Sequence, residues 1–173
     1  MKQLKANIVL SLDGFIAYKD GDMNWIPNIV SKAIQNDINQ ADTLLMGTNT
    51  HNEIFERNGN WLFKNKNSYV ASHYGDNIAA DESVHFLTVS PMKTILEMKQ
   101  QDKNNLLVIG GGKFISSLIE NELLDILSVY IVPIILGDGI PFLRTSDESR
   151  WELLKTETID NVVHILYKFQ NPV

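Results

Sequence analysis

The sequence lacks three features that would each have pointed to a class of protein. It contains no cysteine, which excludes disulfide bonds and thiolate metal sites. It has no excess of positive charge: the formal net charge is −6, whereas a nucleic-acid surface needs clustered Lys and Arg. Its longest apolar run, residues 129–136, is too short to span a bilayer and contains Pro133.

Two smaller absences bear on the expected location of the protein and on metal binding. Residues 1–7 lead directly into strand-like sequence and include no apolar core of a signal peptide, so we expect a cytoplasmic protein. The histidines have no partners at metal-ligand spacing, so we predict no metal site; they are His51, His73, His85 and His164.

The length and composition of the chain predict one α/β domain over residues 1–173, with 44% hydrophobic residues to build its core. Apolar runs predict strands at 6–12, 43–46, 68–71, 84–87, 106–109, 126–136, 151–158 and 162–169. Helical spacing and helix-start residues predict helices at 28–40, 50–55, 92–101 and from the glycines at 110–112 to about 121. Predicted strands and helices alternate in the first part of the chain, and the C-terminal part contains strands alone. This order predicts a three-layer, mostly parallel sheet with an antiparallel C-terminal edge.

The most informative stretch is residues 106–119, where a buried strand runs into Gly110, Gly111 and Gly112 and then into a helix. Such a turn exposes backbone N–H groups at a helix N-terminus, where a phosphate can approach the main chain. The spacing matches neither a P-loop nor a Rossmann fingerprint, because Phe114 and Ile115 stand where small or hydroxyl residues are needed. The alternative interpretation is a tight turn that binds nothing.

A second strand-to-helix corner follows Met46, with the sequence Gly47-Thr48-Asn49-Thr50. By itself it is typical of an ordinary capped helix. Ligands of open α/β sheets bind at the carboxyl ends of the strands, however, so two such corners side by side would hold both phosphates of a dinucleotide. Ser72 and His73, after the next strand, would then reach the adenosine end.

In these segments the chain resembles the dihydrofolate reductase fold, and more closely the C-terminal reductase domain of bacterial riboflavin-biosynthesis enzymes (RibD). The matching segments are 11–17, 42–50, 108–114 and 123–137, in the same order along the chain. The resemblance implies an eight-stranded sheet and an NADPH-dependent reductase that is often a homodimer. It implies hydride transfer to a pyrimidine- or pteridine-like substrate or a small carbonyl compound, of the 5-amino-6-(5-phosphoribosylamino)uracil reductase type.

The same resemblance implies positions around the cofactor. The pyrophosphate would lie along Ile109, Gly110, Gly111, Gly112, Lys113 and Phe114, with Gly47, Thr48, Asn49 and Thr50 approaching from the neighbouring strand. Ser72 and His73 would lie near the adenosine ribose, and Ala6, Ile16 and the rest of the 16–24 loop would border the nicotinamide. We expect the turn-rich part of that loop, 18–25, to act as a lid.

Two departures from the dihydrofolate reductase pattern matter. Thr48 stands where Arg is common, so the best cation for a 2′-phosphate is missing and a preference for NADPH over NADH comes from the resemblance alone. The acidic residue that holds a pterin ring would fall on Ser31 or Val30, and neither is a carboxylate. Loss of that contact makes folate reduction a poor fit.

The predicted catalytic positions are therefore Ser31 and Asp13, the nearest alternative acid, which can equally be a simple turn residue. The predicted substrate-binding residues are Trp25, Lys32 and Gln35, although Trp25 also suits the core. The alternatives to this reductase are a dihydrofolate reductase, a nicotinamide or flavin nucleotide-binding protein without turnover, and a dimer module built on strand 126–136.

Overall fold

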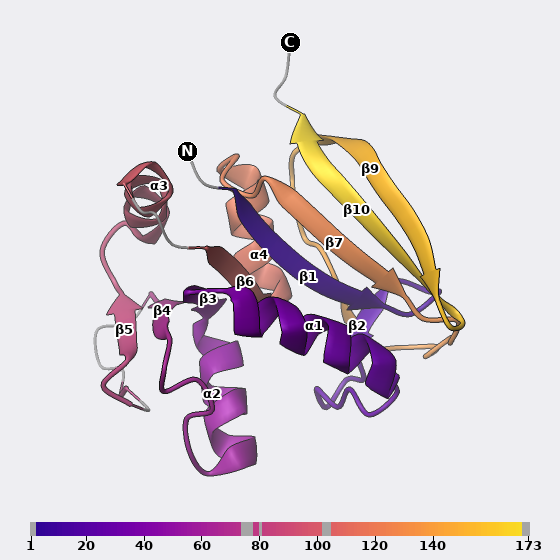
Figure 1. The fold of residues 1–173 in the computed structure, drawn as a ribbon, viewed down its shortest axis with the longest axis horizontal. Coiled ribbons are helices and arrows are strands. Elements are labelled where there is room, and N and C mark those ends of the chain that lie inside the picture. Colours follow the sequence, from indigo (N-terminus) through magenta and orange to yellow (C-terminus); the bar gives the residue numbers. More distant parts are fainter. Residues whose placement is uncertain (1–2, 74–77, 80, 102–104, 171–173) are drawn as a thin grey trace.

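An eight-stranded sheet forms the centre of the protein, in a computed structural model that describes residues 3–73, 78, 79, 81–101 and 105–170 (Figure 1). The strand order is β5-β4-β3-β6-β1-β7-β10-β9. The strands are β1 (Leu4–Leu10), β3 (Thr43–Gly47), β4 (Asn67–Ala71), β5 (Val84–Leu87), β6 (Leu106–Gly110), β7 (Ile126–Ile131), β9 (Arg150–Ile159) and β10 (Val162–Gln170). The first six run parallel, and β10 is antiparallel to both β7 and β9. The predicted fold class is confirmed.

Within the described residues, four helices cover the two faces of this sheet (Figure 1). They are α1 (Asn28–Gln40), α2 (Thr48–Asn58), α3 (Pro91–Gln101) and α4 (Gly112–Glu120). One apolar cluster joins α3 and α4 to the sheet through Ile95, Ile115 and Leu118, and it includes the centre of β1. Two further clusters lie under α1 and α2 on the opposite face. Residues of a buried parallel strand are apolar on both faces because helices cover both.

The predicted strand 126–136 is too long. Strand β7 ends at Ile131, and Pro133, which has no N–H to donate to a neighbouring strand, follows two residues later. The chain then forms β8 (Ile140–Pro141), which pairs with β2 (Phe15–Ala17) in a separate two-stranded sheet. Sequence reasoning missed both short strands because neither is long enough to show an alternating pattern.

A buried ion pair holds α3 against the start of the sheet. The Lys99 ammonium is 2.7 Å from Asp125 and also donates to the Leu123 carbonyl. Asp125 in turn accepts the Leu4 N–H at 2.6 Å, so a single carboxylate links α3 to the amino-terminal ends of β1 and β7. Removing one member of such a pair leaves the other charge without its partner.

In the part of the chain that the structure describes, no helix has the length and apolar character needed to cross a bilayer.

Candidate functional site

Two glycine corners lie side by side at the carboxyl ends of β3 and β6. Met46 pairs with Gly110 in the sheet, and α2 and α4 start directly after the two strands. The N-cap residues are Gly47 for α2 and Gly111 for α4, so no side chain caps either helix. The first backbone N–H groups of two neighbouring helices are therefore left for an external acceptor.

The space between the corners is narrow and would be filled by any larger residue. A Cβ atom on Gly110 or Gly111 would lie 3.3 or 3.2 Å from the Thr50 hydroxyl oxygen. A Cβ atom on Gly47 would lie 3.3 Å from Cβ of Phe114. Gly110 also has φ of +135°, a conformation that L side chains rarely adopt, and its peptide bond to Gly111 is cis. The backbone at both corners stays bare because these residues have no side chain.

Gly112 has a different reason to be glycine. A Cβ atom there would lie 2.5 Å from the Phe142 carbonyl oxygen and 3.5 Å from Cδ1 of Ile16. The segment after β8 thus crosses directly over the first turn of α4. Gly112 is also one of the predicted phosphate contacts, and its missing side chain makes room for this crossing.

The other predicted cofactor residues lie around the corners in different ways. The Thr48 hydroxyl donates to the Ala71 carbonyl at 3.2 Å, which joins the start of α2 to the end of β4. Ser72 follows there and is buried, and His73 is exposed. Asn49 and Lys113 are exposed in the first turns of α2 and α4.

Three other predicted residues belong to the apolar core. Phe114 is buried between α4 and the sheet, and Ile109 packs against the cluster under α2. Ala6 is fully buried in the cluster between the sheet and α4, so its side chain has no surface to offer a ligand. Its neighbours in β6 and β7 and the α4 side chains enclose it, and the expectation that Ala6 borders the nicotinamide stays a prediction.

The predicted substrate residues do not converge on the corners. Ser31 and Lys32 are exposed on α1, and Gln35 donates to Asn39 of the same helix at 3.1 Å. Trp25 is half-buried against the cluster of β7 and α1, as the core interpretation of this residue expects. Among the described residues, Ser31 and Lys32 have no side-chain hydrogen bond, so the structure gives neither a fixed orientation.

Asp13 fastens the loop after β1 to the loop after β7. Its carboxylate accepts hydrogen bonds from the Ser11 hydroxyl at 2.6 Å and from the Gly137 and Leu136 N–H groups at 2.8 and 3.1 Å. The Ser11 hydrogen bond, followed by those from the two backbone N–H groups, lowers the pKa of Asp13 below its usual value, although partial desolvation opposes this. An ionised Asp13 can position the loops but has no proton to give near neutral pH.

The predicted lid is tied to its surroundings at two points. Arg57 of α2 donates to the Gly21 carbonyl at 2.9 Å, and Lys19 forms an ion pair with Asp138. A hollow of about 400 Å³ lies between the predicted lid and the loop after β7. It is lined by Tyr18, Lys19, Asp20, Leu136 and Asp138. Its walls follow the carboxyl ends of β1 and β7, the edge at which an α/β sheet places its ligands.

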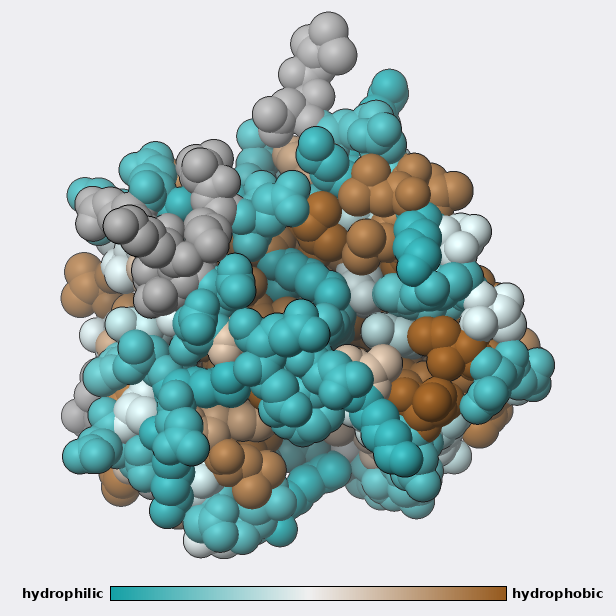
Figure 2. Space-filling view, in the orientation of Figure 1, coloured by the Kyte–Doolittle hydropathy of each residue, from teal (hydrophilic) through white to brown (hydrophobic). Residues whose placement is uncertain are grey.

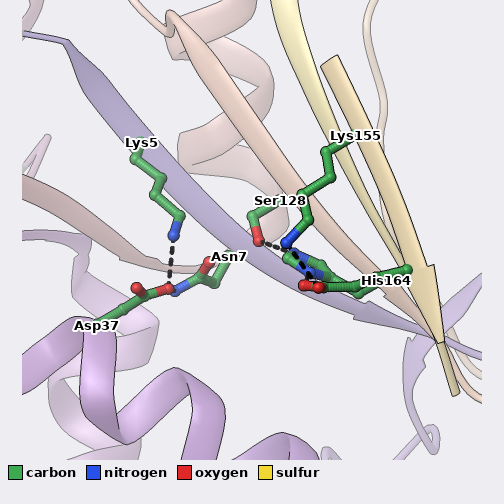
Figure 3. Close-up of polar contacts among 7 residues, drawn as sticks. Lys5, Asn7, Asp37, Ser128, Lys155 and His164 are labelled. Carbon is green, nitrogen blue, oxygen red and sulfur yellow. Dashed lines mark hydrogen bonds and ion pairs between the residues drawn. The ribbon is translucent and has the colours of Figure 1, made fainter. Parts of the chain in front are cut away.

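Sequence reasoning missed two polar clusters on the α1 side of the sheet, drawn in Figure 3. In one, Asp37 of α1 accepts hydrogen bonds from Lys5 at 2.7 Å and Asn7 at 2.8 Å. The signal was available: Lys5 and Asn7 alternate with buried apolar residues in β1, and polar groups on a covered face need a partner in the covering helix.

The second cluster links β7, β10 and β9. The Ser128 hydroxyl is 2.8 Å from Nε2 of His164, and Nδ1 of His164 is 2.9 Å from Glu157 (Figure 3). The order serine, histidine, carboxylate resembles a hydrolase triad, but Ser128 is completely buried and cannot meet a substrate. His164 also stacks on Tyr130, with ring centroids 4.2 Å apart, and burial raises the pKa of Tyr130. The cluster therefore fixes the hairpin to the sheet.

In the described part of the chain, no three His, Asp or Glu residues gather as metal ligands. A larger hollow of about 740 Å³ lies on the α1 side at the opposite end of the sheet, beside Lys5, Ile126 and Lys168. It adjoins the amino-terminal ends of the parallel strands, away from the two glycine corners.

Comparison with known proteins is consistent with this geometry. The family model described as the RibD C-terminal domain matches residues 2–165. The Bacillus subtilis (strain 168) protein YwjB is 26% identical over 164 residues, which cover 92% of this chain and 94% of YwjB. A Shewanella sp. PV-4 crystal structure named for riboflavin biosynthesis superposes with a TM-score of 0.83 at 24% identity, over 98% of this chain and 99% of that one. Enterococcus faecalis dihydrofolate reductase, complexed with NADP(H), superposes with a TM-score of 0.74 at 19% identity, over 98% and 97% of the two chains. The predicted resemblance is confirmed.

Proposed function

The chain belongs to the RibD C-terminal domain family, and from this premise we propose that it is an NADPH-dependent reductase. It would transfer hydride to a small polar heterocycle or carbonyl compound, with a pyrimidine of the 5-amino-6-(5-phosphoribosylamino)uracil type as the first candidate. One observation carries the proposal: two helices with glycine N-caps begin side by side at the carboxyl edge of the sheet.

The residues at these corners fit a dinucleotide diphosphate. Its two negative phosphates would accept hydrogen bonds from the first N–H groups of α2 and α4, where the helix dipoles also favour negative charge. The bare Gly47, Gly110 and Gly111 let the diphosphate approach the main chain, and the exposed Lys113 adds a positive charge at the start of α4. When bound, the nicotinamide cofactor supplies the hydride.

Preference for NADPH rests on relatives more than on the charges of this chain. NADP(H) is bound to the Enterococcus faecalis reductase of the same fold. Here the uncharged Thr48 occupies the start of α2, so no cation stands there for a 2′-phosphate. The Thr48 hydroxyl already donates to the Ala71 carbonyl. Substitution Thr48→Arg is therefore expected to raise NADPH affinity relative to NADH by about tenfold, since a charge-assisted hydrogen bond contributes roughly 1.5–3 kcal/mol.

On the substrate side, the 18–22 and 136–138 loops would enclose the reacting carbon and keep water away from it. Asp13 would act as a positioning residue, since its carboxylate fastens the loop after β1, residues 11–14, to the N–H groups of Leu136 and Gly137 in the second of these loops. The proton that completes the reduction would come from water, because an ionised Asp13 cannot supply it.

Two alternatives predict different results. A dihydrofolate reductase needs a carboxylate for the pterin ring, and at that position α1 offers the exposed Ser31 or the fully buried Val30, neither of which is acidic. A nucleotide-binding protein without turnover would bind the cofactor at the same corners but reduce nothing.

Calorimetric titration with NADPH, NADH and FMN, followed by the nicotinamide absorbance with a panel of pyrimidines, pterins and small carbonyls, separates these possibilities. We expect NADPH binding and oxidation that depends on a pyrimidine or carbonyl compound. Binding without oxidation would support the non-catalytic alternative, and rapid turnover of dihydrofolate would overturn the argument from Ser31. Absence of nucleotide binding would refute the proposal.

A further inference from the structure

The larger hollow lies on the α1 side of the sheet, at the end opposite the glycine corners. Its volume of about 740 Å³ is within the range of roughly 300–1,000 Å³ that is usual for small-molecule sites. The last turn of α1 forms one wall, and the β9–β10 hairpin forms the other. Among the described residues, no helix lies over β10 and β9 on this side of the sheet, so this part of the sheet face is uncovered (Figure 1).

The floor of the hollow is apolar. Ile126 of β7 lies two residues before Ser128, on the same face of the sheet, and Leu166 of β10 pairs with Ser128. Both apolar residues line the hollow, and Leu107 of β6 continues the floor beneath α1. An apolar floor is typical of a ligand pocket, in which a small number of polar groups then fixes the orientation of the ligand.

A bulge in β9 adds Leu154 to this floor. Lys155 pairs with Leu166, and Leu153 pairs with Tyr167. Leu154 is therefore an extra residue between two paired positions, and it lines the hollow. Leu153 lies on the other face, opposite Tyr167, which packs against the cluster around α4. Leu154 is 46% exposed, and brown hydrophobic surface lies over this hairpin at the upper right of Figure 2, so the apolar floor is accessible to a ligand.

The two lysines that line the hollow differ in their partners. The Lys5 ammonium is 2.7 Å from the Asp37 carboxylate, so its charge is already balanced. Lys168 forms no ion pair and no side-chain hydrogen bond with any described residue, although Glu152 is its cross-strand neighbour in β9. The hollow therefore presents one ammonium group without an ionic partner beside an apolar floor. An anionic ligand would form a charge-assisted hydrogen bond there, which is stronger than a bond between neutral groups.

From these observations we propose that the hollow binds a small organic carboxylate with an apolar body. The carboxylate accepts a hydrogen bond from Lys168, and the apolar body covers Ile126, Leu154 and Leu166. The proposal does not rest on the reductase activity, because the hollow adjoins the amino-terminal ends of the parallel strands and the glycine corners lie at their carboxyl ends. A failure of either proposal therefore leaves the other open to its own test.

Fluorescence titration with 8-anilinonaphthalene-1-sulfonate tests the site, because this aromatic anion emits more strongly in apolar surroundings. We expect one probe molecule to bind per chain and decanoate, an alkyl carboxylate, to compete with it. We expect NADPH to leave the probe in place, because the glycine corners lie at the other end of the sheet. Absence of probe binding, failure of decanoate to compete, or displacement of the probe by NADPH would contradict the proposal.

Two neighbouring leucines provide a matched pair of variants. Leu154→Glu places a carboxylate in the apolar floor and is expected to raise the dissociation constant of the probe by about tenfold or more. Leu153→Glu introduces the same charge one residue away, on the other face of the sheet, and is expected to leave the dissociation constant unchanged. Both leucines are about half exposed, so neither substitution disturbs the core. Equal weakening by both variants, or by neither, would refute the proposed site.

A second pair of variants tests the charge. Lys168→Gln removes the ammonium group and is expected to raise the dissociation constants of the probe and of decanoate by about tenfold. Lys93→Gln, on the exposed side of α3, removes the same charge elsewhere and is expected to change neither constant. Urea unfolding of each variant checks that the fold is retained. Unchanged binding by a folded Lys168→Gln variant would overturn the proposal.

Discussion

Substitution Gly112→Ala tests the packing of the candidate site, because the sign of the change in the free energy of unfolding depends on whether space is free beside Gly112. Gly112 is the first residue of α4 and does not have a positive φ, so the backbone itself would accept alanine. If space were free, alanine would stabilise the protein by about 0.4–1 kcal/mol, because it restricts the unfolded chain. The structure instead places the new Cβ 2.5 Å from the Phe142 carbonyl oxygen.

That contact is too short for any real Cβ, so the segment after β8 must move. Overpacking of this kind costs about 1–3 kcal/mol. The expected net result is a loss of about 1–2 kcal/mol in the free energy of unfolding. Urea unfolding measures it, with Gly111→Ala as the matched neighbour, whose new Cβ would meet only Thr50, at 3.2 Å. A stabilised Gly112→Ala variant would refute the reasoning that the segment after β8 packs directly against the first turn of α4.

Three further substitutions test other parts of the account. Lys99→Met keeps the stem of the side chain but leaves Asp125 with only its backbone contact, and should reduce the free energy of unfolding by about 2 kcal/mol in urea; an unchanged value would show that the ion pair does not stabilise the fold. Asp13→Asn should lower the turnover rate without changing the pH dependence of that rate between pH 5 and 8, since the depressed pKa keeps Asp13 ionised there. The effect of this substitution on the free energy of unfolding should shrink only as the pH falls below about 4. A lost ionisation in the pH–rate profile would instead make Asp13 the proton donor. Ser128→Ala should cost about 1 kcal/mol of stability by removing the bond to His164 and leave turnover intact; loss of turnover in a folded variant would contradict its structural role.

The parts of the fold that follow local rules could be predicted from the sequence. Residues 28–40 form a helix as expected, because Pro27 precedes an apolar stripe at helical spacing. Likewise, Gly47 and Gly110 interrupt buried strands and precede helices, which was enough to predict two corners on one edge.

What could not be predicted depends on contacts between distant segments. The crossing of Phe142 over Gly112 joins residues thirty positions apart, and no local pattern marks it. The resemblance placed Ala6 near the nicotinamide, and the complete burial of its side chain depends on α4, far along the chain. The role of His164 likewise becomes visible only when β10 lies between Ser128 and Glu157.

The central claim is that the backbone of the two glycine corners binds the diphosphate of a nicotinamide dinucleotide. Backbone amide NMR during titration with NADPH tests it most directly, because it reports each N–H separately. We expect the largest shifts at residues 48–50 and 111–113, and at least about tenfold weaker binding by a folded Gly111→Ala variant, whose Cβ would stand between the corners. Shifts confined to other parts of the sheet, or wild-type affinity in Gly111→Ala, would contradict the claim.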